Sequence, residues 1–469
     1  VNRGVNVDKK RARDFTEGNI LSHLIAFSWP MFLGNFLQAL YNTVDTFWVG
    51  RFLGTEALAA VSASFPIIFF LVSLVIGVGM ATTILVSQYY GAKDDRGVKR
   101  TVNTSLFLMT IAALLVSIIG LIFYSSIFRL VNLPESLMKD ASAYLTIFLS
   151  GLVFTFLYNG LSAIMRGFGD SLTPLYFLII STVINIILDP LFILGFGPIP
   201  PLGVAGVAWA TVLAQGVSAI FGLIYLFKKA RLATWDKNLL KPDKTIVKQL
   251  ITIGTPAGLQ QALVSIAMLF LSGLVNKHGE IIVASYGLGG RIDQFVFMPA
   301  MSVSLAVSAL TGQNLGANKP ERVREVWCYS NFLTAVIAGV LTIAIFFFPD
   351  FWARIFTPDL AVREMTFTYL RIVSLSYIVF SLMFSTGGIS RAAGDTLITM
   401  SITLLSLWAV RLPLAKFFSE GLNLGPKGIF LGIAISPVVG FILNLIYYYS
   451  GRWKTRNLVS RKTLPDEGN

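Results

Sequence analysis

The chain is dominated by long apolar stretches that are separated by short breaks containing charged residues, glycine or proline. Each stretch reaches the roughly 20 predominantly apolar residues that a helix needs to cross a lipid bilayer. The twelve predicted spans lie near residues 22–49, 57–88, 101–128, 137–164, 172–195, 204–228, 247–275, 281–313, 325–349, 362–387, 396–418 and 428–450. In a chain of 469 residues these spans leave no room for a large soluble domain. The sequence therefore predicts an all-α integral membrane protein, with the lipid bilayer as its surroundings.

The composition excludes several other classes of protein. Only 13% of the residues are charged, whereas soluble domains contain about 25%. The 37 phenylalanines and 8 tryptophans are incompatible with a disordered chain. One cysteine, Cys328, and two histidines, His23 and His278, cannot supply a cluster of soft metal ligands. We therefore expect no zinc or haem site and no cofactor.

The basic residues indicate how the chain is oriented. Of the 37 Lys and Arg residues, 26 lie on the side of both termini, and the other 11 lie opposite or within spans. Because cytoplasmic loops carry the excess of positive charge, both termini are expected in the cytoplasm, which requires an even number of spans. The net charge of +13 is then explained by anionic lipid headgroups, and no nucleic-acid partner is expected. Residues 1–21 are basic without an apolar core, which predicts a cytoplasmic segment and not a signal peptide.

Short motifs recur at a spacing of about 225 residues. The recurring pairs are Trp29-Pro30 with Thr255-Pro256, Gln88-x-x-Gly91-Ala92 with Gln313-x-x-Gly316-Ala317, Arg166-x-x-Gly169-Asp170 with Arg391-x-x-Gly394-Asp395, and Gly206 with Gly428. Such a repeat is typical of membrane proteins built from two structural halves, and it predicts two pseudo-symmetric six-helix lobes. The predicted segments are a cytoplasmic N-terminal segment (1–21), an N-lobe (22–228), a cytoplasmic linker (229–246), a C-lobe (247–450) and a cytoplasmic tail (451–469).

Two acidic residues, Asp45 and Asp189, lie inside predicted spans. A charged group at the centre of a bilayer costs about 2.5–3.5 kcal/mol on insertion scales, so each acid requires an explanation. Both acids end a stripe of hydrogen-bonding groups that lies on one face of an otherwise apolar helix. The stripe before Asp45 consists of Gln38, Tyr41 and Asn42, and the stripe before Asp189 consists of Thr182 and Asn185. An ion-binding pair is the preferred hypothesis, and two satisfied structural acids are the alternative.

The acid pair is confined to the predicted N-lobe, because the repeat places the apolar stretch near Leu271 opposite Asp45 and Leu412 opposite Asp189. If the two carboxyl groups share a dry enclosure, desolvation and mutual repulsion favour binding of a proton near neutral pH. Sodium is the other candidate, because hard cations prefer oxygen ligands. The oxygens predicted to bind the coupling ion belong to Asp45, Asn185, Asp189 and Thr211. No other metal site is expected.

Further polar and aromatic residues lie within the predicted spans. Core packing explains each one singly, but together they predict a central cavity that binds flat, amphipathic cations. The predicted cavity residues are Gln38, Tyr41, Asn42, Tyr158, Asn159, Gln260, Gln261 and Arg291, with Tyr377, Ser381 and Ser385 as further polar positions. For Arg291, Asp293 and Arg411, bracing between the lobes is the preferred hypothesis, and substrate contact is the alternative.

One short string hints at an enzyme. Gly167-x-Gly169-Asp170 matches a motif of intramembrane aspartyl proteases, but no Tyr-Asp partner string exists. The Gly-Asp pair recurs at Gly394-Asp395 before a later span, where aspartate is a favourable helix N-cap. No phosphate-binding Gly-x-x-x-x-Gly-Lys-Ser/Thr loop is present in the sequence. The sequence therefore predicts a protein that is not an enzyme and is driven by an ion gradient.

The order and spacing of these motifs resemble those of the multidrug and toxic compound extrusion (MATE) transporters over nearly the whole chain. The motifs that carry the resemblance are Trp29-Pro30, Val44-Asp45-Thr46, Val49-Gly50-Arg51, Gln88-x-x-Gly91-Ala92, Gln313-x-x-Gly316-Ala317, Arg166-Gly167-x-Gly169-Asp170 and Phe297-Met298-Pro299-Ala300. The resemblance implies a secondary active antiporter that exports small amphipathic, mostly cationic compounds in exchange for protons or sodium by alternating access. It also implies a multi-pass protein of the prokaryotic cell (inner) membrane.

Carried over residue by residue, the N-lobe cation site of the family falls on Asp45, Asn185, Asp189 and Thr211. This pattern resembles the DinF-type and archaeal branch. The NorM-type branch has additional acids in the seventh and tenth spans, and the cores of those spans lack them here, so no C-lobe cation site is expected. The resemblance further implies that the first helix bends at its proline, which makes Pro30 a hinge.

Two rival functions follow from the residues. A flippase of the same broader superfamily would move a lipid-linked anionic head group, and Arg291 and Arg411 within spans favour it. A passive channel would need a continuous polar pore, which the proline-containing arrangement of two lobes does not favour. The antiporter is expected to be a monomer.

Overall fold

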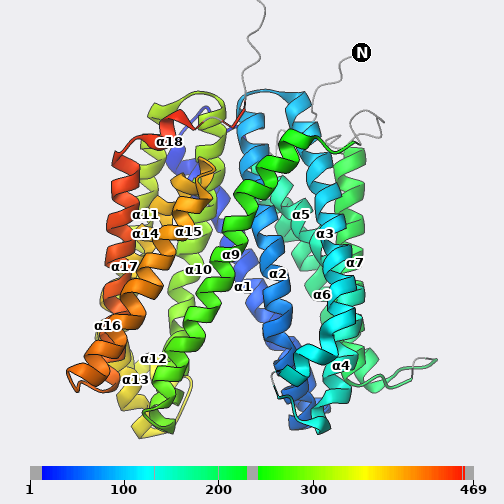
Figure 1. Ribbon diagram of the computed structural model, residues 1–469, viewed down its shortest axis with the longest axis vertical. Coiled ribbons are helices and arrows are strands. Elements are labelled where there is room, and N and C mark those ends of the chain that lie inside the picture. The colour runs from blue at the N-terminus through cyan, green and yellow to red at the C-terminus, as the bar shows by residue number, and fades with distance from the viewer. Residues whose placement is uncertain (1–12, 131, 199, 230–240, 457, 460–469) are drawn as a thin grey trace, which may run out of the picture. The chain divides into compact units, whose positions relative to one another are not determined.

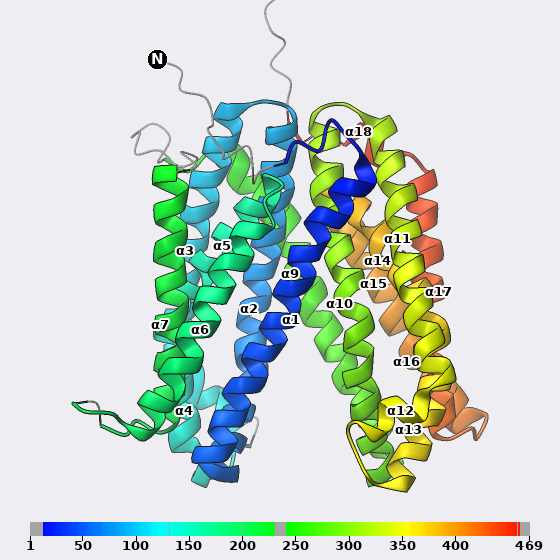
Figure 2. The ribbon, with the colours of Figure 1, turned by 180° about the vertical axis from the view of Figure 1, so that it is seen from behind.

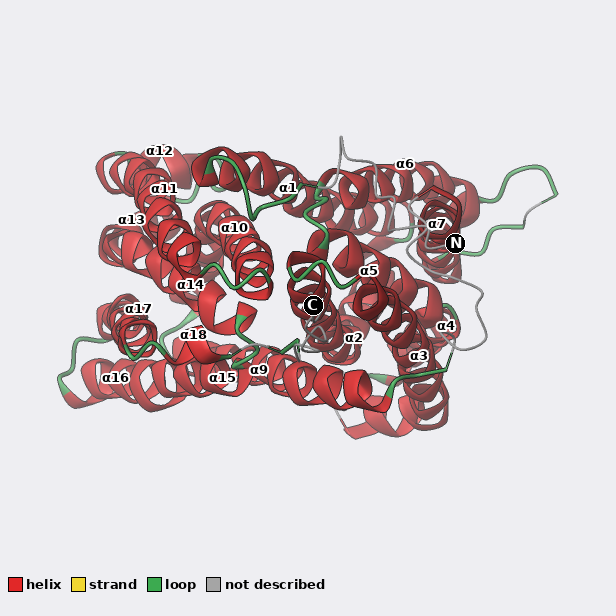
Figure 3. Cartoon of the chain, turned by 90° about the horizontal axis from the view of Figure 1, so that it is seen from above, coloured by secondary structure: helices red, strands yellow, loops and turns green. Residues whose placement is uncertain are grey.

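The computed structural model describes residues 13–130, 132–198, 200–229, 241–456 and 458–459. Within these residues the regular elements are helices, with no β-strand among them (Figure 3). Eleven helices are long and apolar enough to cross a membrane, and a bent pair of shorter helices raises the number to twelve. The predictions of an all-α membrane protein and of twelve spans are therefore confirmed for the described chain.

The described residues form two compact units. The first unit contains residues 13–14 and the described part of 30–258, and the second contains residues 15–29 and the described part of 259–459 (Figures 1 and 2). The helices of the first unit are α1 (Ile20–Phe52) from Pro30 onward, α2 (Gly54–Gly91), α3 (Asp95–Leu130), α4 (Glu135–Ser150), α5 (Leu152–Gly167), α6 (Leu172–Leu194), α7 (Val204–Ile224), the π-helical η1 (Tyr225–Lys229) and α9 (Lys244–Asn276) up to Gly258.

The second unit contains the remaining helices. Its elements are the rest of α9, α10 (Glu280–Gly316), α11 (Pro320–Phe347), α12 (Pro349–Arg354), α13 (Leu360–Val373), η2 (Ser374–Ser376), α14 (Tyr377–Ala392), α15 (Thr396–Leu404), η3 (Leu405–Arg411), α16 (Leu412–Lys416), η4 (Phe417–Gly421), α17 (Pro426–Tyr449) and α18 (Arg452–Thr455). The eleventh span is thus interrupted by two π-helical stretches, η3 and η4.

The units differ from the predicted lobes at two helices. The helix α1 passes from the second unit to the first between Trp29 and Pro30, and α9 passes from the first to the second after Gly258. The prediction placed each of these spans wholly in one lobe. Each transition lies at or close to a proline, Pro30 or Pro256, where the helix lacks a backbone hydrogen bond.

The predicted terminal segments and the linker fall largely on residues that lie outside the described ranges. These residues are 1–12 of the predicted N-terminal segment, 230–240 of the predicted linker, and 457 and 460–469 of the predicted tail. The division of the chain into an N-lobe, a linker and a C-lobe at the predicted residues stays a prediction.

The fourth span is not the continuous helix near 137–164 that the sequence predicts. It consists of α4 and α5, which meet at Gly151 with a bend of 50°. A Cβ atom on Gly151 would lie 2.3 Å from Cγ1 of Val212, so α7 approaches the bend too closely for any larger residue. Hydropathy cannot reveal such a bend, because it reports how apolar a segment is and not the direction of its axis.

Two repeat-related glycines set the packing of the last spans of each unit. A Cβ atom on Gly206 of α7 would lie 2.7 Å from the backbone carbon of Phe192 in α6. A Cβ atom on Gly428 of α17 would lie 2.4 Å from the backbone carbon of Phe418. Both helices therefore begin in backbone contact with the preceding span. Figure 2 shows α6 and α7 side by side in the first unit.

The outer faces of the helices are apolar. Ile122 of α3 is 65% exposed and Phe347 of α11 is 66% exposed, whereas Ser117 of α3 and Thr334 of α11 are buried. Large apolar side chains that point outward while hydroxyl groups point inward suit a lipid environment, in which exposed polar groups cannot find hydrogen-bond partners. This arrangement supports the assignment of these helices as membrane spans.

Candidate functional site

The first unit brings together the four residues predicted to bind the coupling ion. Asp45 lies on α1, Asn185 and Asp189 lie one helical turn apart on α6, and Thr211 lies on α7. The amide Nδ2 of Asn185 donates a hydrogen bond of 3.2 Å to Oδ1 of Asp189. The side chains of Asp45 and Asp189 interact directly, and the Tyr41 hydroxyl approaches Thr211. Three helices thus contribute to one polar cluster, which we call the first acid cluster.

The first acid cluster is largely sealed from solvent. Asn185 and Asp189 are 0% exposed, Thr211 is 4% exposed and Tyr41 is 5% exposed, whereas Asp45 is partly buried. Side chains one turn apart on a helix point in the same direction, which places Tyr41 beside Asp45 on α1 and Asn185 beside Asp189 on α6. Asp45 is the member of the first acid cluster with the most access to the exterior of the first unit.

Five oxygens of the first acid cluster are buried and lack a hydrogen-bond partner at suitable geometry. They are Oη of Tyr41, Oδ1 of Asp45, Oδ1 of Asn185, Oδ2 of Asp189 and Oγ1 of Thr211. Buried polar atoms are almost always hydrogen-bonded, so this group of oxygens has the capacity to bind a proton or a small cation. The donor set consists of oxygens alone, which fits a proton bound by the carboxylates or a hard cation such as sodium. Among the described residues, no group of three or more His, Cys, Asp or Glu is arranged for a metal ion.

The residues of the predicted substrate cavity are divided between the two units. In the first unit, Gln38 and Asn42 are exposed, Tyr41 is buried, and Tyr158 and Asn159 are partly buried. The Asn159 amide donates a 2.8 Å hydrogen bond to the backbone oxygen of Thr155.

In the second unit, Gln260 donates a 2.7 Å hydrogen bond to Oγ1 of Thr403, Gln261 is partly buried and Arg291 is exposed. Assignment of these residues to one substrate cavity stays a prediction.

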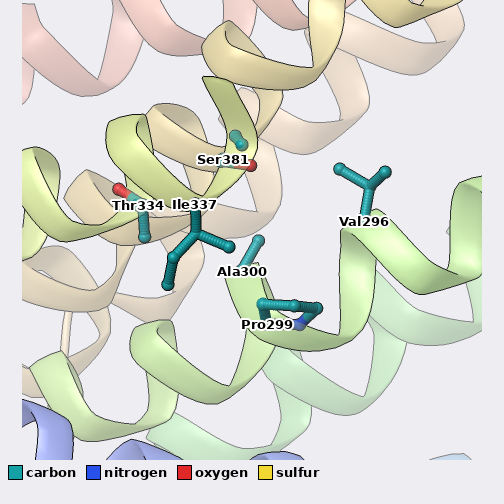
Figure 4. A pocket seen from close by; sticks show the side chains of 7 residues that line it. Val296, Pro299, Ala300, Thr334, Ile337 and Ser381 are labelled. Carbon is teal, nitrogen blue, oxygen red and sulfur yellow. The ribbon is translucent and has the colours of Figure 1, made fainter. Parts of the chain in front are cut away.

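A small pocket lies within the second unit among α10, α11 and α14 (Figure 4). It is lined by Val296, Pro299, Ala300, Thr334, Ile337, Ala338 and Ser381. Ser381 is the one lining residue that the sequence analysis singled out as a polar position. The other lining residues are mostly apolar, so the pocket itself offers few groups that could orient a polar ligand.

The second unit contains a buried acid whose partners the sequence analysis missed. Asp293 of α10 accepts hydrogen bonds from the hydroxyl groups of Tyr369 at 2.6 Å and Tyr377 at 2.5 Å. Both partners belong to the same unit as Asp293, so the expectation that Asp293 braces one lobe against the other is wrong. Arg411, for which bracing was also expected, donates a hydrogen bond of 2.7 Å to Ser436 of the same unit. The partners of Asp293 lie 76 and 84 residues away in the sequence, beyond the reach of helix periodicity.

The protease-like string has a structural role in the first unit. Oδ1 of Asp170 accepts hydrogen bonds from the backbone nitrogens of Leu172 and Thr173 at the start of α6. This is the helix-capping role predicted for it. The repeat-related Asp395 differs, because its carboxylate accepts a hydrogen bond from Tyr447 and pairs with Arg456 at 3.2 Å, without capping α15. Asp395 thus stands at the N-cap position of α15, as predicted, but its side chain makes no capping hydrogen bond.

The comparisons with known proteins agree over almost the full chain. The family model described as MatE matches residues 30–191 and again residues 256–417. The protein described as "Probable multidrug resistance protein YpnP" of Bacillus subtilis (strain 168) is 34% identical over 459 residues, which cover 96% of this chain and 100% of that protein. "Probable multidrug resistance protein YoeA" of the same organism is 35% identical over 436 residues, which cover 92% of this chain and 94% of that protein.

Solved structures lead to the same family. The structure described as "Outward-facing conformation of a multidrug resistance MATE family transporter of the MOP superfamily" matches with a TM-score of 0.87 and 26% identity, covering 96% of this chain and 99% of the other. The family model matches more than half of the chain, and the relatives align with it nearly from end to end. The chain therefore belongs to the MatE family and is a MATE transporter.

Proposed function

We propose that this transporter is a secondary active antiporter that exports amphipathic, mostly cationic compounds in exchange for protons or sodium. The observation that carries the proposal is the first acid cluster, in which five buried oxygens from three helices lack hydrogen-bond partners. A buried acid pair of this kind is suited to binding and releasing a small cation. The relatives YpnP and YoeA are named as probable multidrug resistance proteins, which supports drugs as the exported compounds.

The proposed mechanism is alternating access. Binding of the ion at Asp45 and Asp189 neutralises the acid pair and changes the packing of α1 against α6, which favours release of the drug outside. Loss of the ion on the inner side restores the charged pair and the affinity for another drug molecule. Such coupling requires the ion to bind the two states with different affinity, and typical differences are about 1–3 kcal/mol. The predicted location in the inner membrane with both termini in the cytoplasm belongs to this proposal, and the monomeric state stays a prediction.

A vesicle experiment tests the proposal directly. The full chain is reconstituted into liposomes, and transport of a fluorescent cationic drug is followed under a proton gradient alone, a sodium gradient alone, or neither. We expect drug movement under at least one gradient and collapse of that movement when an ionophore removes the gradient. Drug movement that is equally fast without any gradient would contradict antiport and would favour a passive channel.

A flippase is not supported as a second function. Arg411, one of the two arginines that favoured it, is 8% exposed and is bound to Ser436 inside the second unit. Arg291 alone is exposed and available to an anionic head group. An oxyanion of a lipid-linked head group is best bound by several converging donors, so a single arginine is a weak basis for this function.

Replacement of Pro30 by alanine tests the hinge that belongs to the proposed mechanism. Alanine restores a backbone N–H that can donate to the carbonyl of Ala26, a gain of about 0.5–1.5 kcal/mol in helix stability. We expect thermal stability to rise and drug efflux to fall several-fold, because a stiffer α1 bends less readily. The matched control is Pro66→Ala in α2, a proline inside a helix that stays within the first unit. Equal efflux by the Pro30 and Pro66 variants would show that Pro30 is not a hinge.

A further inference from the structure

The second unit has its own buried acid centre, which the proposed function does not use. Asp293 is 4% exposed, Tyr369 is 2% exposed and Tyr377 is 1% exposed. Both tyrosine hydroxyls donate to the Asp293 carboxylate, one to each oxygen. Two donated hydrogen bonds stabilise the ionised carboxylate, so this centre holds a negative charge away from water. A buried charge of this kind requires a positive partner.

Arg411 is the cationic side chain of this centre. It is 8% exposed, and its Nε donates a hydrogen bond of 2.7 Å to Oγ of Ser436, which is fully buried. Arg411 interacts electrostatically with Asp293, Tyr369 and Tyr286, although within the described residues it forms no ion pair closer than 4.0 Å. The guanidinium is therefore a buried positive charge that acts on the Asp293 carboxylate, although the two groups form no ion pair.

Two local features of the backbone place these side chains. A Cβ atom on Gly289 would lie 2.3 Å from Cδ1 of Tyr369, so the glycine lets the tyrosine ring lie against α10. The hydroxyl of Tyr369 then reaches Asp293, which lies one helical turn after Gly289. Arg411 is the last residue of the π-helical stretch η3. Short π-helical stretches are frequent at functional sites, because they redirect the side chains that follow.

This centre and the first acid cluster have one repeat position in common, that of a tyrosine. Tyr369 follows Tyr144 by 225 residues, and Tyr144 interacts electrostatically with Asp45 and Asp189. Arg411 stands next to Leu412, the residue that the repeat aligns with Asp189. The two halves therefore each place a tyrosine from the same repeat position beside a buried acid. Only the second half also places an arginine there.

We propose that Arg411 is a built-in cation that takes, in the second unit, the place of the exchangeable ion in the first. This inference rests on the proposed function of the first acid cluster. The guanidinium neutralises Asp293 permanently, so the second unit needs no proton or sodium ion and exchanges none. Arg411 is thereby the residue that confines ion exchange to one half of the transporter.

The inference predicts a gain of ion binding on removal of the arginine. Arg411→Met keeps the length and apolar character of the side chain but leaves Asp293 without its counter-charge, so the centre is expected to take up a proton or a sodium ion instead. The titratable or charged groups around this position are Tyr286, Tyr369, Tyr377 and Asp293 itself. Purified full-length protein is titrated with sodium chloride by calorimetry, and in parallel its proton uptake is measured potentiometrically.

We expect Arg411→Met to bind one more cation per molecule than the unmodified protein, and Arg411→Met combined with Asp293→Asn to lose this gain. Arg411→Lys, which retains the charge, is the matched control and should show no gain. Unchanged binding by a folded Arg411→Met protein would overturn the inference. If Arg411→Met is too unstable to titrate, the melting temperature of the double variant tests the inference instead. Removal of both charges should restore the melting temperature that Arg411→Met lowers. A double variant that is no more stable than Arg411→Met would contradict the charge balance.

A second background separates this inference from the proposed function. In a protein that carries Asp45→Asn and Asp189→Asn, ion binding by the first acid cluster should be lost. Adding Arg411→Met should then create binding that depends on Asp293 alone. Ion binding that persists in the Asp45/Asp189 variant would contradict the proposed function. Failure of Arg411→Met to create binding in that background would contradict the inference on Arg411.

Discussion

Replacement of Asp45 by asparagine is expected to lower gradient-driven drug efflux by about 5-fold to 150-fold, the range that typical coupling free energies give. Asparagine has nearly the same shape as aspartate but cannot bind a proton at neutral pH and is a weaker ligand for sodium. The substitution removes one of the two interacting carboxyl groups, while the hydrogen bond from Asn185 to Asp189 can persist. The measurement is the initial rate of drug export from vesicles under the gradient that drives the unmodified protein.

The matched control is Asp170→Asn. Asp170 is also a fully buried acid of the first unit, but its carboxylate caps α6, and asparagine caps a helix about as well as aspartate. This variant should therefore transport normally. Asp189→Asn should cause a loss similar to that of Asp45→Asn, and the double variant should be little worse than either, because both acids act on one ion. Normal efflux by Asp45→Asn in the same vesicles would disprove the ion-binding role of the first acid cluster.

The first acid cluster could be predicted from the sequence because its members are spaced along helices. The distances of four residues between Tyr41 and Asp45 and between Asn185 and Asp189 follow the period of a helix face. The cost of a charge inside a span then singled out the two acids. That the faces of α1 and α6 meet is a tertiary fact, and the sequence supported it only through the resemblance to a known family. Ion binding itself is untested and stays a prediction.

The acid centre of the second unit could not be predicted in this way. Asp293 has no polar stripe of the same form on α10, and its two tyrosine partners come from α13 and from the start of α14. The signal that was available is the repeat: Tyr369 stands 225 residues after Tyr144. That signal becomes informative only when the electrostatic interaction of Tyr144 with Asp45 and Asp189 is known.

The spans themselves follow from hydropathy, but their interruptions do not. Gly151 is one of 40 glycines in the chain, and nothing in the sequence marks it as the point where the fourth span bends. The side chain that comes close to this glycine, Val212, lies on a different helix. The hydropathy of the eleventh span likewise does not show where its π-helical stretches begin and end.

Replacement of Gly77 by leucine is expected to destabilise the first unit more than any substitution on a lipid-facing surface. A Cβ atom on Gly77 of α2 would lie 2.3 Å from the backbone oxygen of Gly254 and 2.7 Å from the backbone nitrogen of Gly258. Gly254 and Gly258 are four residues apart on α9, the spacing at which small residues let two membrane helices come into backbone contact. A leucine cannot rotate away from backbone atoms, so the two helices must separate.

Overfilling a packed interior typically lowers the free energy of unfolding by about 1–3 kcal/mol. Because Gly77→Leu must displace two helix backbones, we expect a loss at or above the upper end of this range. The measurement is the melting temperature of the purified protein in detergent, followed by loss of the monodisperse peak in size-exclusion chromatography. Gly273→Leu is the matched control. Gly273 lies on α9, the helix that Gly77 of α2 contacts, and a Cβ atom on Gly273 would meet nothing within 4 Å. Leucine also favours helix formation over glycine by about 1 kcal/mol, so the control should be as stable as the unmodified protein or more so. Equal melting temperatures for the two variants would show that α2 and α9 do not depend on this glycine contact, and the spacing of Gly254 and Gly258 would then have no role in the packing of the first unit.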